Sequence, residues 1–550
     1  MKNLMKLTFL PGLLVAGLFF FSGFSRPGSE TRITEIGPEG RITKRMAAPS
    51  RTGNPFLYGK TPDRKEGLLA RMSGNVMLLL AKKHGLTTIQ GKNIPEEAAP
   101  SRPSISPKAL SDSPVGTDPS VQNNEPSIAV RPNNQNIVVV ASHYYPPGPL
   151  IATYTSFDRG DTWSGPYFLP KRFPSDFLSD PVIRYSPNSA SLYACYMSIR
   201  GDVSTADIMV SRSTNNGLSW QTPKVALPGA DYDGDGFLDF PDKPWLGVHP
   251  FPNTLPANAM VYVTTTIFEA DGDVKIAFSR STNSASSFTP LWLFYYTDGR
   301  TLQGSRPIGG RGGDVLISFY TAAGDGWLIG DFDIDSVYFS GYGTTPVSWV
   351  SAVVDMSYEL PYYLGPNDAY HRWWGGMFPS VAMAPNGTAY VVFTADPVAG
   401  SADTEDGDIF MVRAPKPYSA WTQPRRINWT GGNAQGYPTV GVKKITGGAI
   451  VFAAWEDHVL SPVDNELYDI WGLKHVDDFL SQTYPIRVTD FSSYSDDIFI
   501  GDYIDCDAGT KVTPFLQDRV IHVVWTDRSH QTSKLEPDDD VWADMIELFY

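Results

Sequence analysis

The chain has 550 residues, of which 19% are charged and 13% aromatic, with 49 glycines and 45 prolines. This composition argues against a disordered chain and is typical of a β-rich globular protein with many turns. The net charge of −15 argues against nucleic acid and anionic membrane surfaces as partners, and it leaves metal cations and neutral substrates.

The first 25 residues have the pattern of an export signal. Lys2 and Lys6 flank the start of an apolar run over 7–21, and small residues follow it as a cleavage point. We therefore expect a secreted or periplasmic protein with no membrane span after signal cleavage. An uncleaved anchor is the alternative, although the run is short for a span.

Residues 26–115 differ in composition from the rest of the chain. They are rich in proline, serine, arginine and lysine, and one patch from Glu66 to His84 has a helical pattern. The stretch PSRPSISPKALSDSPVG has the composition of a linker. We expect a flexible leader that carries one docking helix.

An internal repeat organises residues 116–550. Six segments carry a proline at their second position: EPSIAV from Glu125, DPVIRY from Asp180, KPWLGV from Lys243, RPIGGR from Arg306, FPSVAM from Phe378 and YPTVGV from Tyr437. Two further runs with alternating apolar residues follow each segment, so each unit contains several strands. We expect the residues before these prolines to surround the mouth of a central channel.

A seventh unit begins at Gly501 without the proline and ends one strand short of a four-stranded sheet. A radial array of sheets must be closed, because an open ring leaves exposed strand edges. The repeat therefore predicts an all-β propeller of seven four-stranded blades, closed by a strand from the residues before Glu125. Six blades with a closing fragment are the alternative.

Three turns between third and fourth strands carry a second signature. The sequences are SFDRGDTW (156–163), STNNGLSW (213–220) and STNSASSF (281–288). The first matches Ser-x-Asp-x-Gly-x-Thr-Trp at every defined position, whereas the second and third keep only part of it. In such a turn, Asp or Asn bonds backbone amides, Gly adopts a positive φ and Trp packs between sheets.

This signature resembles the Asp-box, or BNR repeat, of the sialidase-like β-propellers, over about residues 120–550. The resemblance implies a folding motif on the face opposite the active site. It also implies a carboxylate clamp of three arginines, for which Arg306 is the best candidate, with Arg372 and Arg528 as partners. The family's Arg-Ile-Pro motif is absent, because Arg41-Ile42-Thr43 lacks the proline. Strict sialidase activity is therefore doubtful.

The loop DYDGDGFLDFPD between the second and third units holds five aspartates within twelve residues. Its spacing fits a calcium loop, in which Gly236 supplies the sharp turn. The expected ligands are side-chain oxygens of five aspartates and one backbone carbonyl: Asp231, Asp233, Asp235, Phe237, Asp239 and Asp242. A solvated acidic turn is the alternative. We expect Ca²⁺ to have a structural role there.

Titratable and aromatic residues gather on the turns predicted for the functional face. In DAYHRWWGG, His371 and Arg372 have acid–base and anion-binding chemistry, and Trp373 and Trp374 suit stacking on sugars. Further catalytic candidates are His143, Tyr144, Glu456 and Asp457. Further substrate-binding candidates are Tyr145, Tyr437, His458 and Arg528. Each of these residues alone also fits an ordinary polar loop.

Three functions remain open: a glycoside hydrolase that uses Glu456 or Asp457, a polysaccharide lyase in which His371, His143 or Tyr144 abstracts a proton, and a non-catalytic propeller that binds a glycan or protein. Glycan processing is slightly favoured, by fold analogy. We expect a monomer. Cys195 and Cys506 fall in different units with another unit between them, so both are expected to be free and buried.

Overall fold

The computed structural model describes residues 33–35, 44–47 and 112–548, apart from gaps at 117, 119–120, 146–147, 188, 251–258, 271, 297–298, 311, 323–331, 356–377, 396–406, 429–434, 461–466, 475–484, 495–500, 510–518 and 530–539. The predicted signal peptide and the helical patch lie outside these residues. The described residues contain no helix with the length and apolar character needed to cross a bilayer.

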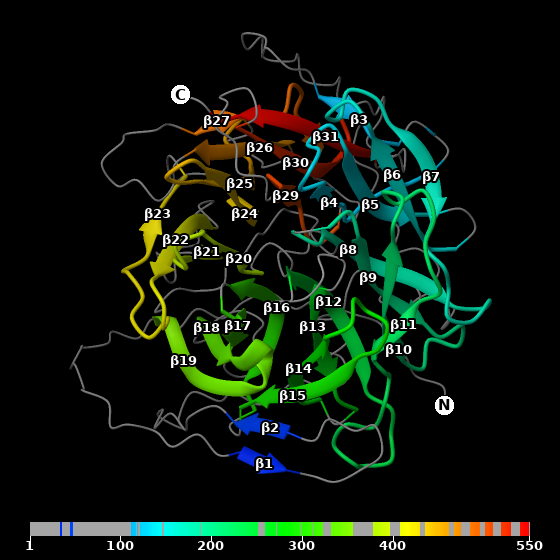
Figure 1. Cartoon of the computed structure of the whole chain (residues 1–550), viewed down its shortest axis with the longest axis vertical. Coiled ribbons are helices and arrows are strands. Elements are labelled where there is room, and N and C mark those ends of the chain that lie inside the picture. The colour runs from blue at the N-terminus through cyan, green and yellow to red at the C-terminus, as the bar shows by residue number, and fades with distance from the viewer. Residues whose placement is uncertain are drawn as a thin grey trace, which may run out of the picture. The chain divides into compact units, whose positions relative to one another are not determined.

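Seven antiparallel sheets are arranged radially around a central axis, so the prediction of a seven-bladed all-β propeller is confirmed (Figure 1). In each blade, the strands follow one another from the axis outward. The seven-blade reading therefore replaces the six-blade alternative.

The strands of the first three blades are as follows. Blade 1 comprises β4 (Ser127–Val130), β5 (Val138–Tyr144), β6 (Leu150–Ser156) and β7 (Ser164–Phe168). Blade 2 comprises β8 (Phe177–Tyr185), β9 (Leu192–Ile199), β10 (Ala206–Ser213) and β11 (Lys224–Leu227). Blade 3 comprises β12 (Phe240–Pro250), β13 (Ala259–Phe268), β14 (Val274–Ser281) and β15 (Thr289–Tyr295).

The other four blades continue the pattern. Blade 4 comprises β16 (Thr301–Gly310), β17 (Asp314–Ala322), β18 (Phe332–Ser340) and β19 (Thr345–Asp355), with the short 3₁₀ turn η1 (Gly341–Gly343). Blade 5 comprises β20 (Ser380–Met383), β21 (Ala389–Ala395), β22 (Asp408–Ala414) and β23 (Arg425–Arg426). Blade 6 comprises β24 (Gln435–Ile445), β25 (Gly448–Asp457), β26 (Leu467–Lys474), β27 (Ile486–Arg487) and β28 (Ser493–Tyr494). Blade 7 comprises β29 (Asp505–Asp507), β30 (Val520–Asp527) and β31 (Asp540–Glu547).

The ring is closed by a strand from the N-terminal side, as the missing fourth strand predicted. β3 (Ser113–Pro114) pairs antiparallel with β31, and Ser113 lies opposite Ala543. Val115 extends the contact by donating its amide to the Val541 carbonyl at 2.8 Å. The propeller therefore begins at about residue 113, a few residues before the predicted boundary at 116.

The leader contributes two strands in addition to β3. β1 (Ile33–Glu35) and β2 (Lys44–Ala47) form a hairpin, and β2 pairs in parallel with the outer strand β15 of blade 3. Figure 1 shows this hairpin outside β15. The docking helix that the sequence predicted for the leader lies outside the described residues.

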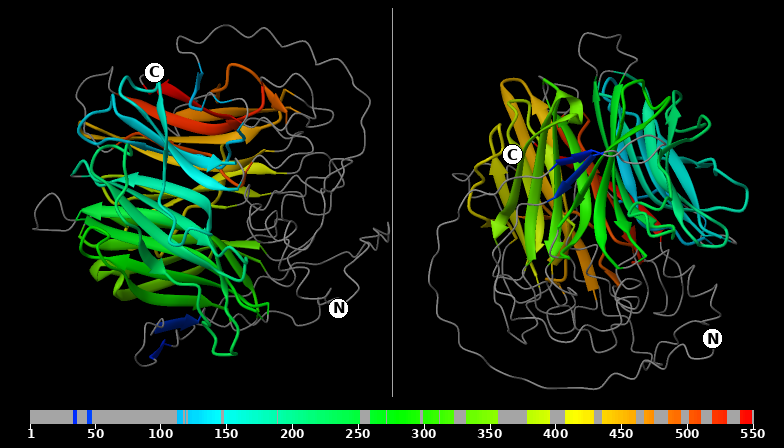
Figure 2. Two further views of the ribbon diagram at one scale, coloured as in Figure 1. Left: turned by 90° about the vertical axis from the view of Figure 1, so that its right-hand side faces the viewer. Right: turned by 90° about the horizontal axis from the view of Figure 1, so that it is seen from below.

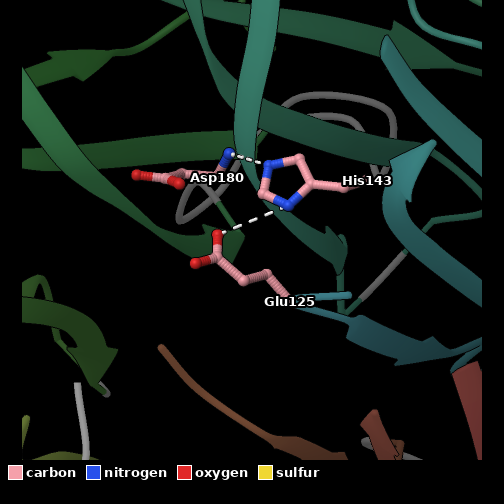
Figure 3. Close-up of side chains that lie close together, drawn as sticks. All are labelled: Glu125, His143 and Asp180. Carbon is pink, nitrogen blue, oxygen red and sulfur yellow. Dashed lines mark hydrogen bonds and ion pairs between the residues drawn. The ribbon is translucent and has the colours of Figure 1, made fainter. Parts of the chain in front are cut away.

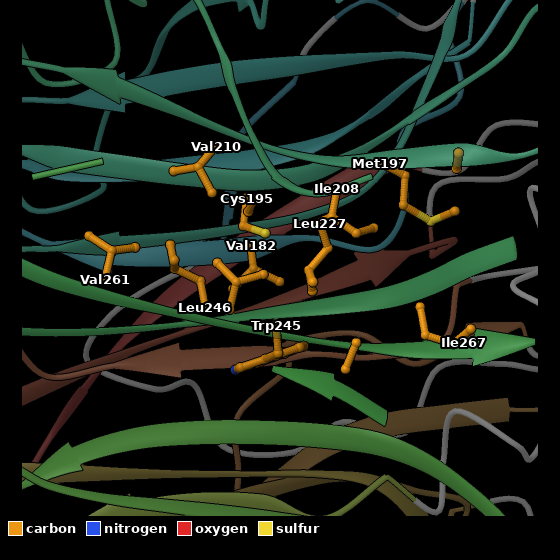
Figure 4. Close-up of a cluster of buried hydrophobic side chains, with 14 of the residues drawn as sticks. Val182, Cys195, Met197, Ile208, Val210, Leu227, Trp245, Leu246, Val261 and Ile267 are labelled. Atoms are coloured by element: carbon orange, nitrogen blue, oxygen red, sulfur yellow. The ribbon is translucent and has the colours of Figure 1, made fainter. Parts of the chain in front are cut away.

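Apolar side chains from neighbouring blades meet between the sheets. Figure 4 shows one such layer, in which Cys195 and Ile208 of blade 2 pack toward Trp245 and Leu246 of blade 3. The strands contribute apolar residues on both faces because each sheet is covered on both sides. Cys195 and Cys506 are free and buried, as expected.

Each blade is an antiparallel meander, so its successive turns alternate between two faces of the ring, which Figure 2 presents edge-on. We call the entry face the one at which the inner strands begin. This face also carries the turns between the second and third strands. The predicted site loops within the described residues all belong to the entry face.

The three Ser-x-Asp-like turns lie on the opposite face and share one hydrogen-bond pattern. In the first, the Gly160 amide donates to Ser156 Oγ at 2.8 Å, and the Thr162 amide donates to Asp158 Oδ1 at 2.9 Å. The same two bonds recur in the second turn (Gly217 to Ser213, Ser219 to Asn215) and in the third (Ala285 to Ser281, Ser287 to Asn283).

The tryptophans of these turns reach a neighbouring strand. Trp163 Nε1 donates to Ser113 Oγ of the closing strand at 3.2 Å, and Trp220 Nε1 donates to Thr153 Oγ1 of blade 1 at 3.2 Å. These two turns therefore tether their own blades to the preceding ones, and the first also secures the closure of the ring.

Candidate functional site

A β-bulge at the start of the inner strand sets the geometry of the channel mouth. The pairing of inner and second strands shifts after Ser179, Asp242, Gln303 and Gly436 in blades 2, 3, 4 and 6. The first bulged residue has positive φ in each: 53° at Asp180, 51° at Lys243, 65° at Gly304 and 51° at Tyr437. Glu125 of blade 1 has φ of 50°. Proline follows four of these five residues because the bulge needs no amide donor there.

This register corrects the sequence alignment of blade 4. The bulge lies at Gly304 and Ser305, so the proline-led segment that starts at Arg306 is displaced by two residues. Arg306 therefore does not belong to the outermost ring. It aligns with Trp245 of blade 3, because both are the first residues after the shift.

Left-handed backbone is costly for residues with a side chain, at about 1–2 kcal/mol each. Glu125, Asp180 and Lys243 all have it, in three adjacent blades. Such strain concentrates at functional sites. Here it directs two acidic side chains, those of Glu125 and Asp180, and the basic side chain of Lys243 toward a common point.

These side chains, with His143 and Asp502, form what we call the mouth cluster. Lys243 Nζ lies 2.5 Å from Asp502 Oδ2, 3.5 Å from Glu125 Oε1 and 3.9 Å from Asp180 Oδ2. All five residues are at most 6% exposed. Three carboxyl groups therefore share one ammonium group in a site with little solvent.

His143 holds two of these residues in place (Figure 3). Its Nε2 accepts the backbone amide of Asp180 at 2.9 Å, so Nδ1 carries the proton and faces Asn124 Oδ1 at 2.8 Å and Glu125 Oε2 at 3.6 Å. Burial lowers the pKa of His143 to about 4. The ring is neutral near pH 7, and both nitrogens are engaged, so His143 is a positioning residue and has no free lone pair for a base.

The two acids nearest His143 have pKa values that are shifted in opposite directions. Burial, together with the charges of Asp180 and Asp502, raises the pKa of Glu125 well above its usual value, against the attraction of Lys243. Burial also acts to raise the pKa of Asp180, but Lys243 and hydrogen bonds from Glu125 and Ser179 outweigh it and lower the pKa. Glu125 is thus the protonated partner and Asp180 the ionised one.

A metal ion is the other occupant that a group of ligand atoms such as the mouth cluster would suit. Ligand atoms of Glu125, His143 and Asp180 lie within 4.8 Å of one another. However, the imidazole lone pair already accepts an amide, and Lys243 supplies a positive charge beside the carboxylates. The donor set therefore suits its own lysine better than a metal ion.

Aromatic rings surround the lysine. Lys243 Nζ lies 5.1 Å from the centroid of Tyr503 and 5.8 Å from that of Phe378. The Tyr503 hydroxyl donates to the Pro181 carbonyl at 3.1 Å, so the side chain crosses from blade 7 to blade 2. These rings exclude water and strengthen the electrostatic interactions within the cluster.

Arg306 lies in the layer below. Its guanidinium stacks on Trp245 at 3.7 Å from the ring centroid, and it donates to Ser380 Oγ at 2.8 Å. Arg184 in the same layer forms a bidentate pair with Asp505, at 2.7 and 3.0 Å. Burial lowers the pKa of Arg306 to about 10. The arginine contributes to the channel core and is only 4% exposed.

The candidates of blades 6 and 7 are also buried on the entry face. His458 Nε2 lies 3.4 Å from Glu456 Oε1, and burial raises the pKa of Glu456. Asp457 accepts the Trp455 indole N–H at 2.9 Å. The cavity that Glu456 and Tyr437 line measures about 10 Å³, which is space for a single water molecule.

The remaining candidates are dispersed. Arg528 is 1% exposed, and its Nη1 donates to the Tyr494 carbonyl at 3.4 Å. The Tyr145 hydroxyl donates to Asn124 Oδ1 at 3.2 Å, whereas Tyr144 packs edge-on against Phe168 at 5.1 Å. The residues His371, Arg372, Trp373 and Trp374 lie outside the described part of the chain.

An open groove of about 730 Å³ lies on the entry face of blade 2. We call it the rim groove. Its lining comes from the blade 1–2 connection, the second turn of blade 2 and the aspartate loop: Phe173, Ser175, Asp176, Arg200, Gly201, Asp202, Ser204, Thr205, Gly229 and Leu238.

Charged and apolar groups alternate in the rim groove. Arg200 lies over the Phe173 ring at 4.5 Å and pairs with Asp207 at 2.6 Å. Phe173 and Leu238 are 42% and 51% exposed. Asp176 of the groove precedes Asp180 of the mouth cluster by four residues, so their Cα atoms lie at most about 14 Å apart.

The fold separates the expected calcium ligands of the aspartate loop. Ligand oxygens of Asp231, Asp233 and Asp239 lie within 4.8 Å of one another. Asp235 accepts the Phe237 amide within the turn, and Phe237 is 66% exposed. Asp242 is fully buried in β12, where its Oδ1 accepts the Lys243 amide at 2.9 Å. The structure therefore brings together three of the six expected ligands.

Sequence reasoning placed Glu125, Asp180 and Lys243 at the mouth but gave them no chemical role. The proline after each residue marked the position, yet it was read only as the start of a strand. Asp502 carried no signal, because blade 7 lacks the proline.

Comparisons with known proteins give the following. No family model matches the chain, and no curated protein matches it. Among solved structures, it is similar to a protein of unknown function from Dyadobacter fermentans, at 12% identity and a TM-score of 0.45, over 80% of this chain and 98% of that one. It is also similar to an α-L-arabinanase from Penicillium chrysogenum complexed with arabinobiose, at 11% identity and a TM-score of 0.43, over 80% and 99%. A Trypanosoma rangeli sialidase in complex with sialic acid aligns at 13% identity and a TM-score of 0.39, over 69% and 59%.

Proposed function

We propose that this chain is a secreted glycan-processing propeller of the glycoside-hydrolase type, with its reaction centre at the mouth cluster. The observation that carries the proposal is the pair Glu125 and Asp180. The two carboxyl groups lie on one face, with oxygens within 4.8 Å, and their pKa values are driven apart. Pairs of acids with divergent pKa values are the usual basis of acid–base assignment in hydrolases.

Glu125 hydrogen-bonds Asp180, and their ligand oxygens lie within 4.8 Å, so the pair is closer than an inverting course requires. Retaining glycosidases hold the two carboxyl groups about 5–5.5 Å apart, whereas inverting enzymes leave about 6.5–9.5 Å for a water molecule. In the retaining course, Asp180 attacks the anomeric carbon while the glycosidic bond breaks and Glu125 gives its proton to the leaving oxygen. A water molecule then displaces Asp180 from the anomeric carbon, and Glu125, now ionised, takes a proton from that water.

The surrounding residues would maintain these roles. Lys243 and the amide-bound His143 keep Asp180 ionised and oriented, and burial keeps Glu125 protonated. The rim groove would hold the sugar units beyond the cleaved bond, because Arg200, Asp202 and Ser204 supply hydrogen-bonding groups beside the exposed ring of Phe173.

Two further parts of the proposal rest on sequence. The pattern of residues 1–25 supports export, and the aspartate loop supports a structural Ca²⁺ site on the same face. Hard oxygen ligands from carboxylates are those that Ca²⁺ prefers.

The test is a panel of arabino-, sialo- and uronate-containing oligosaccharides, with products separated by chromatography. We expect cleavage by the native chain and a loss of at least about 10³-fold in Asp180→Asn and Glu125→Gln. Asp158→Asn, on the opposite face, is the matched control and should keep full turnover. An ultraviolet-absorbing unsaturated product would identify a lyase instead, and binding without any product would identify a non-catalytic propeller.

Azide provides a readout that a purely structural role would not give. Asp180→Gly removes the nucleophile and also relieves the positive φ, since glycine adopts that conformation freely. If Asp180 is the nucleophile, azide should restore turnover and yield a glycosyl azide. Recovery of neither turnover nor azide product in a folded variant would remove Asp180 from that role.

A further inference from the structure

The turn between β13 and β14 brings a further acid to the aspartate loop. The Ala270 amide donates to Asp239 Oδ1 at 3.2 Å, so this turn of blade 3 packs directly on the loop that precedes the blade. Glu269, the neighbouring residue, is fully buried. The two segments therefore meet although 30 residues separate Asp239 from Glu269 in the sequence.

One carboxylate oxygen of Glu269 forms an ion pair, and the other has no hydrogen-bond partner among the described residues. Its Oε2 pairs with Lys275, whereas its Oε1 has no hydrogen-bond partner among the described residues. Burial raises the pKa of Glu269 to about 7, and the nearby charges of Asp239 and Asp233 add to this effect. The oxygen without a hydrogen bond thus belongs to a carboxyl group that interacts electrostatically with the loop aspartates.

Negative charge exceeds positive charge at this place. Asp231, Asp233 and Asp239 hold their oxygens within 4.8 Å of one another. Glu269 lies next to this group in the β12–β13 pairing, where Phe240 is opposite Phe268, and the charges of Asp239 and Asp233 act on it. Lys275 is the cation that the structure records in contact with these four acids, and it binds Glu269 alone. A buried carboxylate oxygen without a donor is costly unless a further cation approaches it.

The loop backbone suits such a cation. Gly234 and Gly236 have φ of 90° and 93°, and a β-carbon at either would meet no atom within 4 Å. The amides of Gly234 and Gly236 both donate to the Asp231 carboxylate, which orients this ligand from within the turn. Ca²⁺ sites typically combine several oxygen ligands from the protein with water molecules.

We propose that Asp231, Asp233, Asp239 and Glu269 together bind one Ca²⁺ ion, which ties the aspartate loop to the β13–β14 turn of blade 3. Glu269 takes the place that the twelve-residue pattern gave to Asp242. The inference rests on the Ca²⁺ site of the proposed function and adds its ligand Glu269, but it is independent of the hydrolase chemistry, because its ligands lie outside the mouth cluster. It also fixes one wall of the rim groove, since Leu238 belongs to the same loop.

Terbium luminescence, with calcium competition, tests the ligand set on the full chain. Tyr232 lies within the loop and serves as the sensitising ring. We expect saturable binding in the native chain and at least a tenfold weaker calcium affinity in Glu269→Gln and in Asp239→Asn. Asp273→Asn, in the same turn, is the control and should bind as the native chain does. Absence of saturable binding in the native chain would overturn the site.

A second variant separates a ligand from a supporting residue. Lys275→Met removes the ion pair of Glu269 but leaves its carboxylate. If Glu269 binds the ion, this variant should keep or increase the calcium affinity, because the competing positive charge is gone. If Glu269 acts only by holding Lys275, both variants should lose affinity equally, and that result would overturn the assignment of Glu269.

Discussion

Replacement of Lys243 by methionine tests the electrostatic account of the channel mouth. Methionine keeps much of the length and volume of the lysine stem but removes the ammonium group. Three carboxyl groups, those of Glu125, Asp180 and Asp502, would then lose their shared counter-charge. The contact with Asp502, at 2.5 Å, is the shortest of the three.

The magnitude follows from burial. Lys243 is 6% exposed, and removal of one partner from a buried ion pair costs about 3–5 kcal/mol. We therefore expect the free energy of unfolding at pH 7 to fall by about 3–5 kcal/mol in Lys243→Met. Lys416→Met is the matched control, because Lys416 is 52% exposed and pairs with Asp314 at 2.8 Å. Its loss should stay below about 1 kcal/mol.

The loss should also depend on pH. Without Lys243, the pKa of Asp180 rises above its unfolded value, so the folded variant binds more protons than the unfolded chain. The difference between native chain and variant should therefore be smaller at pH 5 than at pH 7. Urea unfolding followed by tryptophan fluorescence at both pH values measures it. A loss under about 1 kcal/mol at pH 7, or an equal loss at both pH values, would refute the reasoning.

Three further predictions concern stability elsewhere in the ring, each measured by urea unfolding. Asp158→Ala should lower the free energy of unfolding by about 1–2 kcal/mol, because it removes the acceptor for the Thr162 amide, whereas Asp161→Ala in the same turn should have little effect. Gly304→Ala should cost about 2–4 kcal/mol, since φ is 65° there and the new β-carbon would lie 2.4 Å from the Phe378 ring; Gly448→Ala, in open space, is its control. Burial lowers the pKa of His522 to about 3, so the unfolded chain binds a proton that the folded chain rejects, and stability falls as the pH drops from 6.5 to 4. His522→Gln should reduce this fall by about 3 kcal/mol, and an unchanged pH dependence would contradict the assignment.

The sequence by itself determined the blade architecture. Strand alternation and the recurrent proline specify each unit locally, because a bulge at the start of an inner strand tolerates a residue without an amide hydrogen. The missing fourth strand of the last unit predicted closure from upstream, and β3 provides it. The three Ser-x-Asp-like turns were also predictable from the sequence, because their hydrogen bonds join residues only four positions apart.

Only the tertiary structure decided what meets at the centre. Glu125, Asp180, Lys243 and Asp502 come from four blades, and their interactions depend on how far each inner strand advances along the axis. A shift of two residues in blade 4 moved Arg306 from the mouth into the core, and no pattern within that blade reports the shift. Likewise, Glu269 reaches the aspartate loop because β12 and β13 pair with Phe240 opposite Phe268, which places the ends of two segments 30 residues apart side by side. Local periodicity fixes which residues form a strand, whereas the relative height of separate strands is fixed by the contacts between them.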